Sequence, residues 1–346
     1  MDFFFGISTS SSGGYGRESI IWQYYRFLFD GNFAVCIFFI LSGYSLLISY
    51  NSNRNDNYLS SSAVKRYLRL SPLVAFSVLL SYLLWNYGFY LNKTASDIAG
   101  GHQWFHDAFT GAPSFMSALY QSLIGVYAGE TSYNGPLWTI KIELFASFFI
   151  FAYCALFYKN KKNNIISLFT IAATLVLFDK TGLFFSLFLI GAMIHRIPAQ
   201  KGYKYLIFPA LYLSCQTPWS GLSIQLADLI VKDAFYVSAF LQSFSSVLLM
   251  LAILNSQKIK KLLSLALFVQ LGKLSFSMYV LHLPIIMSVG STTFIKTSHF
   301  IGTSNAAMLA IMTSLIVIFI TSYATYRFID IPSQKVAKFV GNKLAT

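Results

Sequence analysis

Residues 234–254 read AFYVSAFLQSFSSVLLMLAIL, a stretch of about twenty residues without a charged side chain. A helix of that length matches the hydrocarbon core of a bilayer. Similar apolar blocks recur along the chain, in which hydrophobic residues make up 56% and charged residues only 11% of the 346. A soluble domain would carry about twice that charge. The sequence therefore predicts an all-α fold, a polytopic transmembrane helical bundle.

We expect about nine membrane spans, with an extracytoplasmic lead-in over residues 1–32, a transmembrane domain over 33–332 and a cytoplasmic tail over 333–346. Residues 115–127, in a long outer segment, are half apolar and are interpreted as a re-entrant or interfacial helix, with a tenth span as the alternative. The predicted spans are Phe33–Ser49, Pro72–Leu91, Leu137–Tyr158, Ile165–Phe178, Leu183–His195, Tyr205–Cys215, Ala234–Leu254, Phe268–Val289 and Met308–Phe328.

Basic residues gather in alternate loops and so predict the orientation. The positive-inside rule places the rich set, and with it the C-terminus, in the cytoplasm and the N-terminus outside. The same asymmetry explains the net charge of +13 without a nucleic-acid partner, so we expect membrane lipids as neighbours instead. The rich set is Arg54, Lys65, Arg66, Arg69, Lys159, Lys161, Lys162, Arg196, Lys201, Lys204, Lys258, Lys260, Lys261, Lys335, Lys338 and Lys343, and the opposite loops between spans contain Lys93, Lys180, Lys232 and Lys296.

Neither the cysteines nor the histidines predict a metal site. Cys36, Cys154 and Cys215 lie in or beside apolar blocks and form no CxxC or Cys/His cluster, which favours a packing role. His102 and His106 are four residues apart, a spacing that suits a metal ion on a helix. Because no third ligand is evident beside them, we expect no metal.

Ionisable side chains within the predicted spans are candidates for chemistry, because such groups are costly in a bilayer and usually face a partner or a cavity. Lys141 and Glu143 lie two residues apart near the outer end of a span. A helix directs them to different faces, so each needs a partner of its own. An ion pair that only orients helices is the alternative to a functional role for Glu143.

A polar face is predicted on the span that contains His282. Ser275, Tyr279 and His282 are separated by four and three residues, so they share one side of a helix. Such a stripe indicates a cavity wall or a helix contact. Histidine is the natural general base near neutral pH, and a histidine that only packs between helices is the alternative.

Two arginines precede a predicted span on the cytoplasmic side. Arg66 and Arg69 are three residues apart and share a helix face. The planar guanidinium group suits phosphate. Simple anchoring at the cytoplasmic surface is the alternative.

Five short motifs resemble those of acyltransferase family 3, a family of integral membrane enzymes. Each motif is weak alone, but all five occur in the family's order, which makes residues 33–332 the predicted acyltransferase domain. The motifs are Val35–Tyr44 (VCIFFILSGY), Arg66–Pro72 (RYLRLSP), Gly135–Glu143 (GPLWTIKIE), Leu271–Pro284 (LGKLSFSMYVLHLP) and Tyr326–Pro332 (YRFIDIP).

The resemblance implies an O-acyltransferase of the bacterial inner membrane. It would move an acyl group, usually acetyl from acetyl-CoA, to a hydroxyl of a surface polysaccharide, such as a lipopolysaccharide O-antigen, or of a lipid-linked sugar. Glu143 and His282 are then the expected catalytic residues, and Arg66 and Arg69 the expected ligands of the acyl-CoA phosphates. The family's first span, with an Arg near its start and a His near its end, is expected to be missing. A glycolipid transporter or flippase and a truncated, inactive acyltransferase are the alternatives.

Overall fold

The computed structural model describes residues 25–28, 30–53, 56–100, 103–157, 163–177, 179–230 and 233–343. These residues form helices joined by turns and contain no strand. Six helical runs among them are long and apolar enough to cross a membrane, and three shorter apolar helices accompany them. The prediction of an all-α, polytopic helical bundle is confirmed. The six long runs are Gly31–Asn51, Tyr58–Asn86, Gly135–Phe157, Ala234–Leu254, Ala266–Ile301 and Thr303–Gly341.

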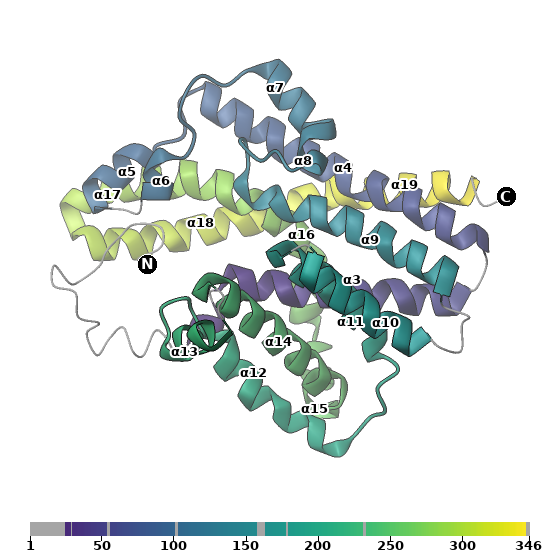
Figure 1. Cartoon of the computed structure of the whole chain (residues 1–346). Helices are drawn as coiled ribbons and strands as arrows, with labels where there is room; N and C mark the ends of the chain where they lie inside the picture. The colour runs from purple at the N-terminus through teal and green to yellow at the C-terminus, as the bar shows by residue number, and fades with distance from the viewer. Residues whose placement is uncertain are drawn as a thin grey trace. The chain divides into compact units, whose positions relative to one another are not determined.

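The chain divides into two compact units, and Figure 1 labels the helices that belong to them. The described part of the first unit lies within Val64–Lys141 and Leu267–Lys343, and that of the second within Gly14–Ala63 and Ile142–Ala266. Helices α4 (Asp56–Asn86), α9 (Trp138–Phe157) and α16 (Ala266–Ile285) have residues in both units.

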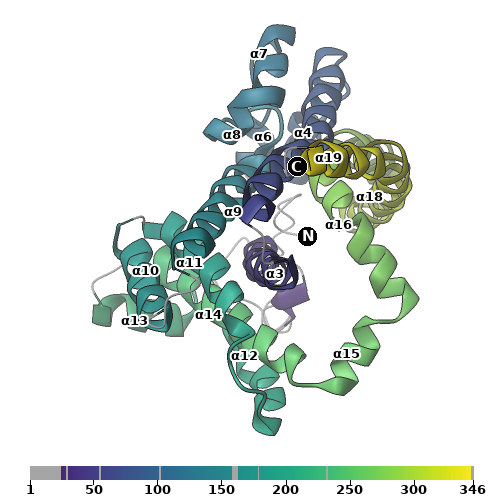
Figure 2. The ribbon, with the colours of Figure 1, turned by 90° about the vertical axis from the view of Figure 1, so that its right-hand side faces the viewer.

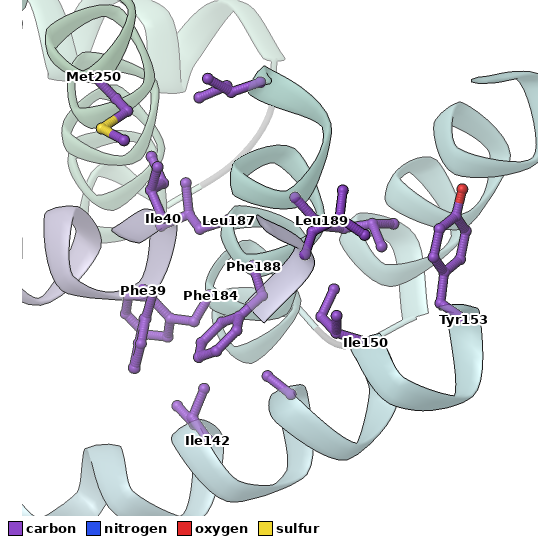
Figure 3. Packing of buried hydrophobic residues seen from close by; sticks show 14 of the residues in the cluster. Phe39, Ile40, Ile142, Ile150, Tyr153, Phe184, Leu187, Phe188, Leu189 and Met250 are labelled. Atoms are coloured by element: carbon purple, nitrogen blue, oxygen red, sulfur yellow. The ribbon is translucent and has the colours of Figure 1, made fainter. Parts of the chain in front are cut away.

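In the second unit, helix α3 (Gly31–Asn53) packs against α11 (Asp179–Ile194) and α14 (Ala234–Leu254), as Figure 2 shows with α3 seen nearly end-on. Phe39 of α3 meets the rings of Phe184 and Phe188 from α11 in the core between them (Figure 3). The remaining helices of this unit are η1 (Arg26–Leu28), α10 (Asn163–Leu177), η4 (Lys201–Leu206), α12 (Ile207–Ser214), α13 (Gly221–Ile230) and α15 (Gln257–Leu263).

Two glycines bring the backbones of α3 and α11 into contact. A Cβ atom at Gly43 would lie 2.0 Å from the carbonyl oxygen of Phe188, and one at Gly191 would lie 2.2 Å from that of Ile40. No side chain fits at either position, because the obstacle is backbone rather than a side chain that can turn aside. The backbones of α3 and α11 therefore pack directly against each other in the core of the second unit.

The three cysteines are buried and none forms a disulfide, as their apolar surroundings predict. Cys36 and Cys154 belong to the core around Phe39. Cys215 follows the last turn of α12. Cys36 and Cys154 thus pack among hydrophobic side chains.

In the first unit, two pairs of helices are each joined by a π-helical segment, so that each pair forms one uninterrupted helix. Segment η5 (Ile286–Gly290) joins α16 to α17 (Ser291–Ile301), and η6 (Tyr326–Asp330) joins α18 (Thr303–Thr325) to α19 (Ile331–Lys343). Figure 2 shows α18 and α19 nearly end-on. Helix α17 packs against α18 and α5. The other helices of this unit are α5 (Asn92–Ala99), α6 (Gln103–Asp107), α7 (Phe115–Tyr120), η2 (Gln121–Gly125), α8 (Val126–Ala128) and η3 (Gly135–Leu137).

Several predicted boundaries differ from the structure. The predicted span Tyr205–Cys215 is helical from η4 into α12 as far as Ser214, but it is not among the helices long and apolar enough to cross a membrane. The run 115–128 is continuous helix but is not among the helices long enough to span. Helix α19 continues through most of the predicted tail. Most of the predicted lead-in, residues 1–24 and 29, lies outside the described residues.

Candidate functional site

Pro284 interrupts the hydrogen bonds of α16 close to His282. Proline has no N–H, so the carbonyl of Val280, four residues earlier, has no donor within its helix. The Asn134 side chain supplies one, since its Nδ2 donates to the Val280 oxygen at 2.8 Å and to the Ser77 hydroxyl of α4 at 3.3 Å. Asn134 is fully buried. This one amide links α4, the segment before α9, and α16.

Tyr279 ties the start of α9 to the same stretch of α16. Its hydroxyl donates to the carbonyl of Pro136. The Thr139 Oγ1 lies 2.8 Å from the Tyr279 oxygen and, because the phenol has one proton, Thr139 is the donor in that contact. The motif at 135–143 therefore begins against the motif at 271–284, which the sequence alone does not bring together.

His282 lies one turn beyond Tyr279 and has a defined tautomer. Its Nδ1 is 2.6 Å from the carbonyl oxygen of Tyr279. A carbonyl only accepts hydrogen bonds, so Nδ1 holds the proton and Nε2 keeps the lone pair of the neutral ring. Ser275, predicted on the same face, is exposed and donates to Gly272 of its own helix. Of the predicted polar stripe, Tyr279 and His282 form the site.

Arg66 and Arg69 lie within α4 rather than before it, because the helix already begins at Asp56. Arg66 is partly buried and Arg69 is exposed. Two side chains of the same motif fix this turn: the Tyr67 hydroxyl donates to the Leu123 carbonyl at 3.0 Å, and the Ser71 hydroxyl lies 2.8 Å from that of Tyr127. Burial raises the pKa of the Tyr127 phenol, which stays neutral. These hydrogen bonds fix the turn of α4 that carries Arg66 and Arg69.

Glu143 and Lys141 have separate partners, as predicted from their spacing. Glu143 is 2% exposed and its Oε1 accepts a hydrogen bond from the Ser42 hydroxyl of α3 at 3.1 Å. The Lys141 Nζ donates to the carbonyl of Ala128 at 3.0 Å, at the C-terminal end of α8. A cation is favourable there because the last carbonyls of a helix lack partners. Lys141 is therefore a helix cap.

The described site residues belong to two units. Arg66, Arg69 and His282 lie in the first unit and Glu143 in the second. Asn134, which no sequence pattern predicted, links Ser77 of α4 to Val280 of α16, the two helices that carry Arg69 and His282. The signal that would have found it is Pro284 inside a predicted span, because a carbonyl freed within a membrane needs another donor.

The link between Asn134 and Val280 gives a testable prediction. We expect Asn134→Ala to lower the unfolding temperature, because an unsatisfied buried carbonyl costs about 1–3 kcal/mol. In a Pro284→Ala background a backbone N–H returns at position 284, so the same change should cost clearly less. Thermal unfolding of the four purified proteins in detergent measures this coupling.

Asn305 supplies the matched control. Its side-chain amide is exposed and donates only to the Ile301 carbonyl of its own helix at 3.0 Å, so Asn305→Ala should change stability little. Equal losses for Asn134→Ala in the two backgrounds would show that the amide does not replace the bond that Pro284 removes.

Comparison with known proteins adds one finding. The family model described as an acyltransferase domain matches residues 5–327, which includes all of the site residues above. No curated protein and no solved structure matches the chain.

Proposed function

The chain belongs to acyltransferase family 3, and from this premise we propose that it moves an acetyl group from acetyl-CoA to a hydroxyl of a surface polysaccharide or a lipid-linked sugar. We place it in a bacterial inner membrane with its C-terminus in the cytoplasm, as the basic loops predict. The observation that carries the proposal is the His282 ring, whose Nδ1 is held by the Tyr279 carbonyl and whose Nε2 can accept a proton.

In the proposed reaction, His282 Nε2 accepts the proton of the acceptor hydroxyl while the hydroxyl oxygen attacks the thioester carbonyl carbon. The new C–O bond forms and the C–S bond breaks. The sulfur leaves as a thiolate, and the imidazolium returns the proton to it, so the products are an acetyl ester and CoA with a neutral histidine. Such a base contributes about 10²- to 10⁴-fold in rate.

Arg66 and Arg69 are proposed to hold the phosphates of the acyl donor on the cytoplasmic side. Arg69 precedes Ser77 by eight residues on α4, about 12 Å of helix rise. Ser77 contacts Asn134, and Asn134 contacts Val280, two residues before His282. The extended pantetheine arm of a CoA thioester can span the distance from Arg69 on α4 to His282 on α16. Phosphates bound at Arg69 are therefore compatible with a thioester near His282.

Glu143 is proposed to bind acceptor hydroxyls or to orient the base. A buried carboxylate is costly unless it accepts hydrogen bonds, and Ser42 supplies one of them. The motif containing Glu143 includes Pro136, which accepts the hydrogen bond of Tyr279.

The test of the function is NMR of surface polysaccharide from cells with and without the chain. We expect an O-acetyl methyl signal that requires the chain and disappears after mild base. An absent signal, with the protein confirmed in the membrane and several polysaccharide backgrounds tried, would contradict the proposal. Glycolipid transport assays in the same cells would then distinguish a transporter from an inactive acyltransferase.

Arg69→Ala should raise the KM for acetyl-CoA by roughly 10- to 100-fold, because hydrogen bonds to a charged group contribute about 1.5–3 kcal/mol. With acetyl-pantetheine, which has no phosphate, the variant and the native protein should behave alike. Lys258→Ala, which removes an exposed basic side chain elsewhere, is the control. If Arg69→Ala changes neither KM nor kcat for acetyl-CoA, Arg69 does not belong to the donor site.

A further inference from the structure

Helix α6 and the residue that follows it present a small open depression in the outer segment predicted between the spans of α4 and α9. It has a volume of about 430 Å³ and is lined by Gln103, Trp104, Asp107 and Ala108, which we call the Trp104 platform. The indole is 45% exposed. A volume of this size lies within the usual range for small-ligand sites.

Hydrogen bonds from Asn92 and the buried ring of Phe105 hold the backbone of the Trp104 platform in place. The Asn92 side chain, almost fully buried, donates to the carbonyls of Phe105 at 2.7 Å and Ala108 at 3.1 Å, which flank the depression. Phe105 is fully buried in a core that includes Phe294 of α17. Two fixed carbonyls and an anchored ring leave α6 little freedom, so the backbone that carries Trp104 is held in place.

The polar side of the platform is also ordered. His106 lies between two carboxylates, with Nδ1 2.5 Å from Asp107 Oδ1 and Nε2 3.2 Å from Asp97 Oδ1. The hydrogen bond from His106, with a further one from Gln103, lowers the pKa of Asp107 below its usual range. Asp107 therefore stays ionised at neutral pH and offers acceptor oxygens next to the indole.

A role as a membrane anchor explains this tryptophan less well. Interfacial tryptophans place the apolar part of the ring in lipid, whereas Trp104 shares its surface with charged and amide side chains. The helix before it exposes Lys93 and Asp97. This surface is therefore suited to water and to polar ligands.

From these features we infer that the Trp104 platform binds a sugar ring of the acceptor glycan. The C–H groups on one face of a pyranose are slightly positive and pack on the negative face of an aromatic ring, while the ring hydroxyls can donate to Asp107 and exchange hydrogen bonds with Gln103. The inference rests on the proposed function for the identity of the ligand, and it adds the place where the acceptor docks.

The test measures binding without catalysis. The full-length protein, purified in nanodiscs, is applied to an array of bacterial surface oligosaccharides, and retained protein is quantified against concentration. We expect the native protein to bind at least one glycan, Trp104→Ala to bind it about tenfold more weakly or worse, and Trp104→Phe to keep most of the affinity because a flat ring remains. Gln103→Ala should weaken binding by a smaller factor.

Two controls separate this inference from the proposed reaction. Trp219→Ala removes another exposed indole, 67% accessible, and should bind glycans like the native protein. Arg69→Ala should also bind normally while its acetyl transfer falls. Glycan binding that depends on Trp104 in a protein without transfer activity would support the platform and contradict the proposed function. An array without bound protein, or equal binding by Trp104→Ala and the native protein, would overturn the platform.

Discussion

Replacing His282 with Asn should reduce acetyl transfer by about 10²- to 10⁴-fold, the range expected when a general base is removed. The Asn amide nitrogen can occupy the position of Nδ1 and still donate to the Tyr279 carbonyl, which in the native protein is 2.6 Å from the ring. No atom then remains at the position of Nε2. Structure is retained while the proton acceptor is lost, so kcat should fall with normal amounts of protein in the membrane.

A second histidine provides a close control for this variant. The His195 Nδ1 is 2.8 Å from the carbonyl of Ala192, three residues earlier, in the same local arrangement. His195→Asn should leave acetyl transfer at its native level. If His282→Asn is active while His282→Ala is not, the bond to Tyr279 is what matters, and His282 is a structural residue rather than a base.

Replacing Gly43 with Ala should prevent stable packing of α3 against α11. The added Cβ would lie 2.0 Å from the Phe188 carbonyl oxygen, and two helix backbones cannot move apart without opening the core around Phe39 and Phe188. Overpacking usually costs about 1–3 kcal/mol, and we expect at least the upper end here. The measurement is thermal unfolding in detergent, together with the amount of protein that reaches the membrane.

Gly272 is the matched control, since it also lies within a helix but a Cβ at this position would meet nothing within 4 Å. Gly272→Ala should be neutral or stabilising by up to about 1 kcal/mol, because alanine favours the helix over glycine. Similar stability of the Gly43→Ala and Gly272→Ala proteins would show that α3 and α11 separate at little cost. The backbone contact would then not explain the glycine of the motif at 35–44.

Part of the candidate site follows from local patterns. The Lys141 and Glu143 spacing predicts separate partners, and each has its own. The three-residue step from Tyr279 to His282 predicts a shared face, and the centroids of the two rings lie 5.8 Å apart. Ser275 obeys the same spacing and still points its hydroxyl at its own helix, because periodicity states which side a residue lies on and not what lies opposite.

Length and hydropathy are properties of each segment, so the sequence alone determined that this is an all-α membrane protein. It also predicted where along the chain α3, α9 and α14 lie. Apolar composition also misled at the predicted span 205–215, which is helical from η4 into α12 but is not among the helices long enough to cross a membrane. Only the tertiary structure decided which motifs meet. Asn134 reaches Val280 across 146 positions, and Ser42 reaches Glu143 across 101. Such contacts depend on how helices distant in sequence pack, because a donor in an apolar interior bonds to whichever acceptor the fold brings near it.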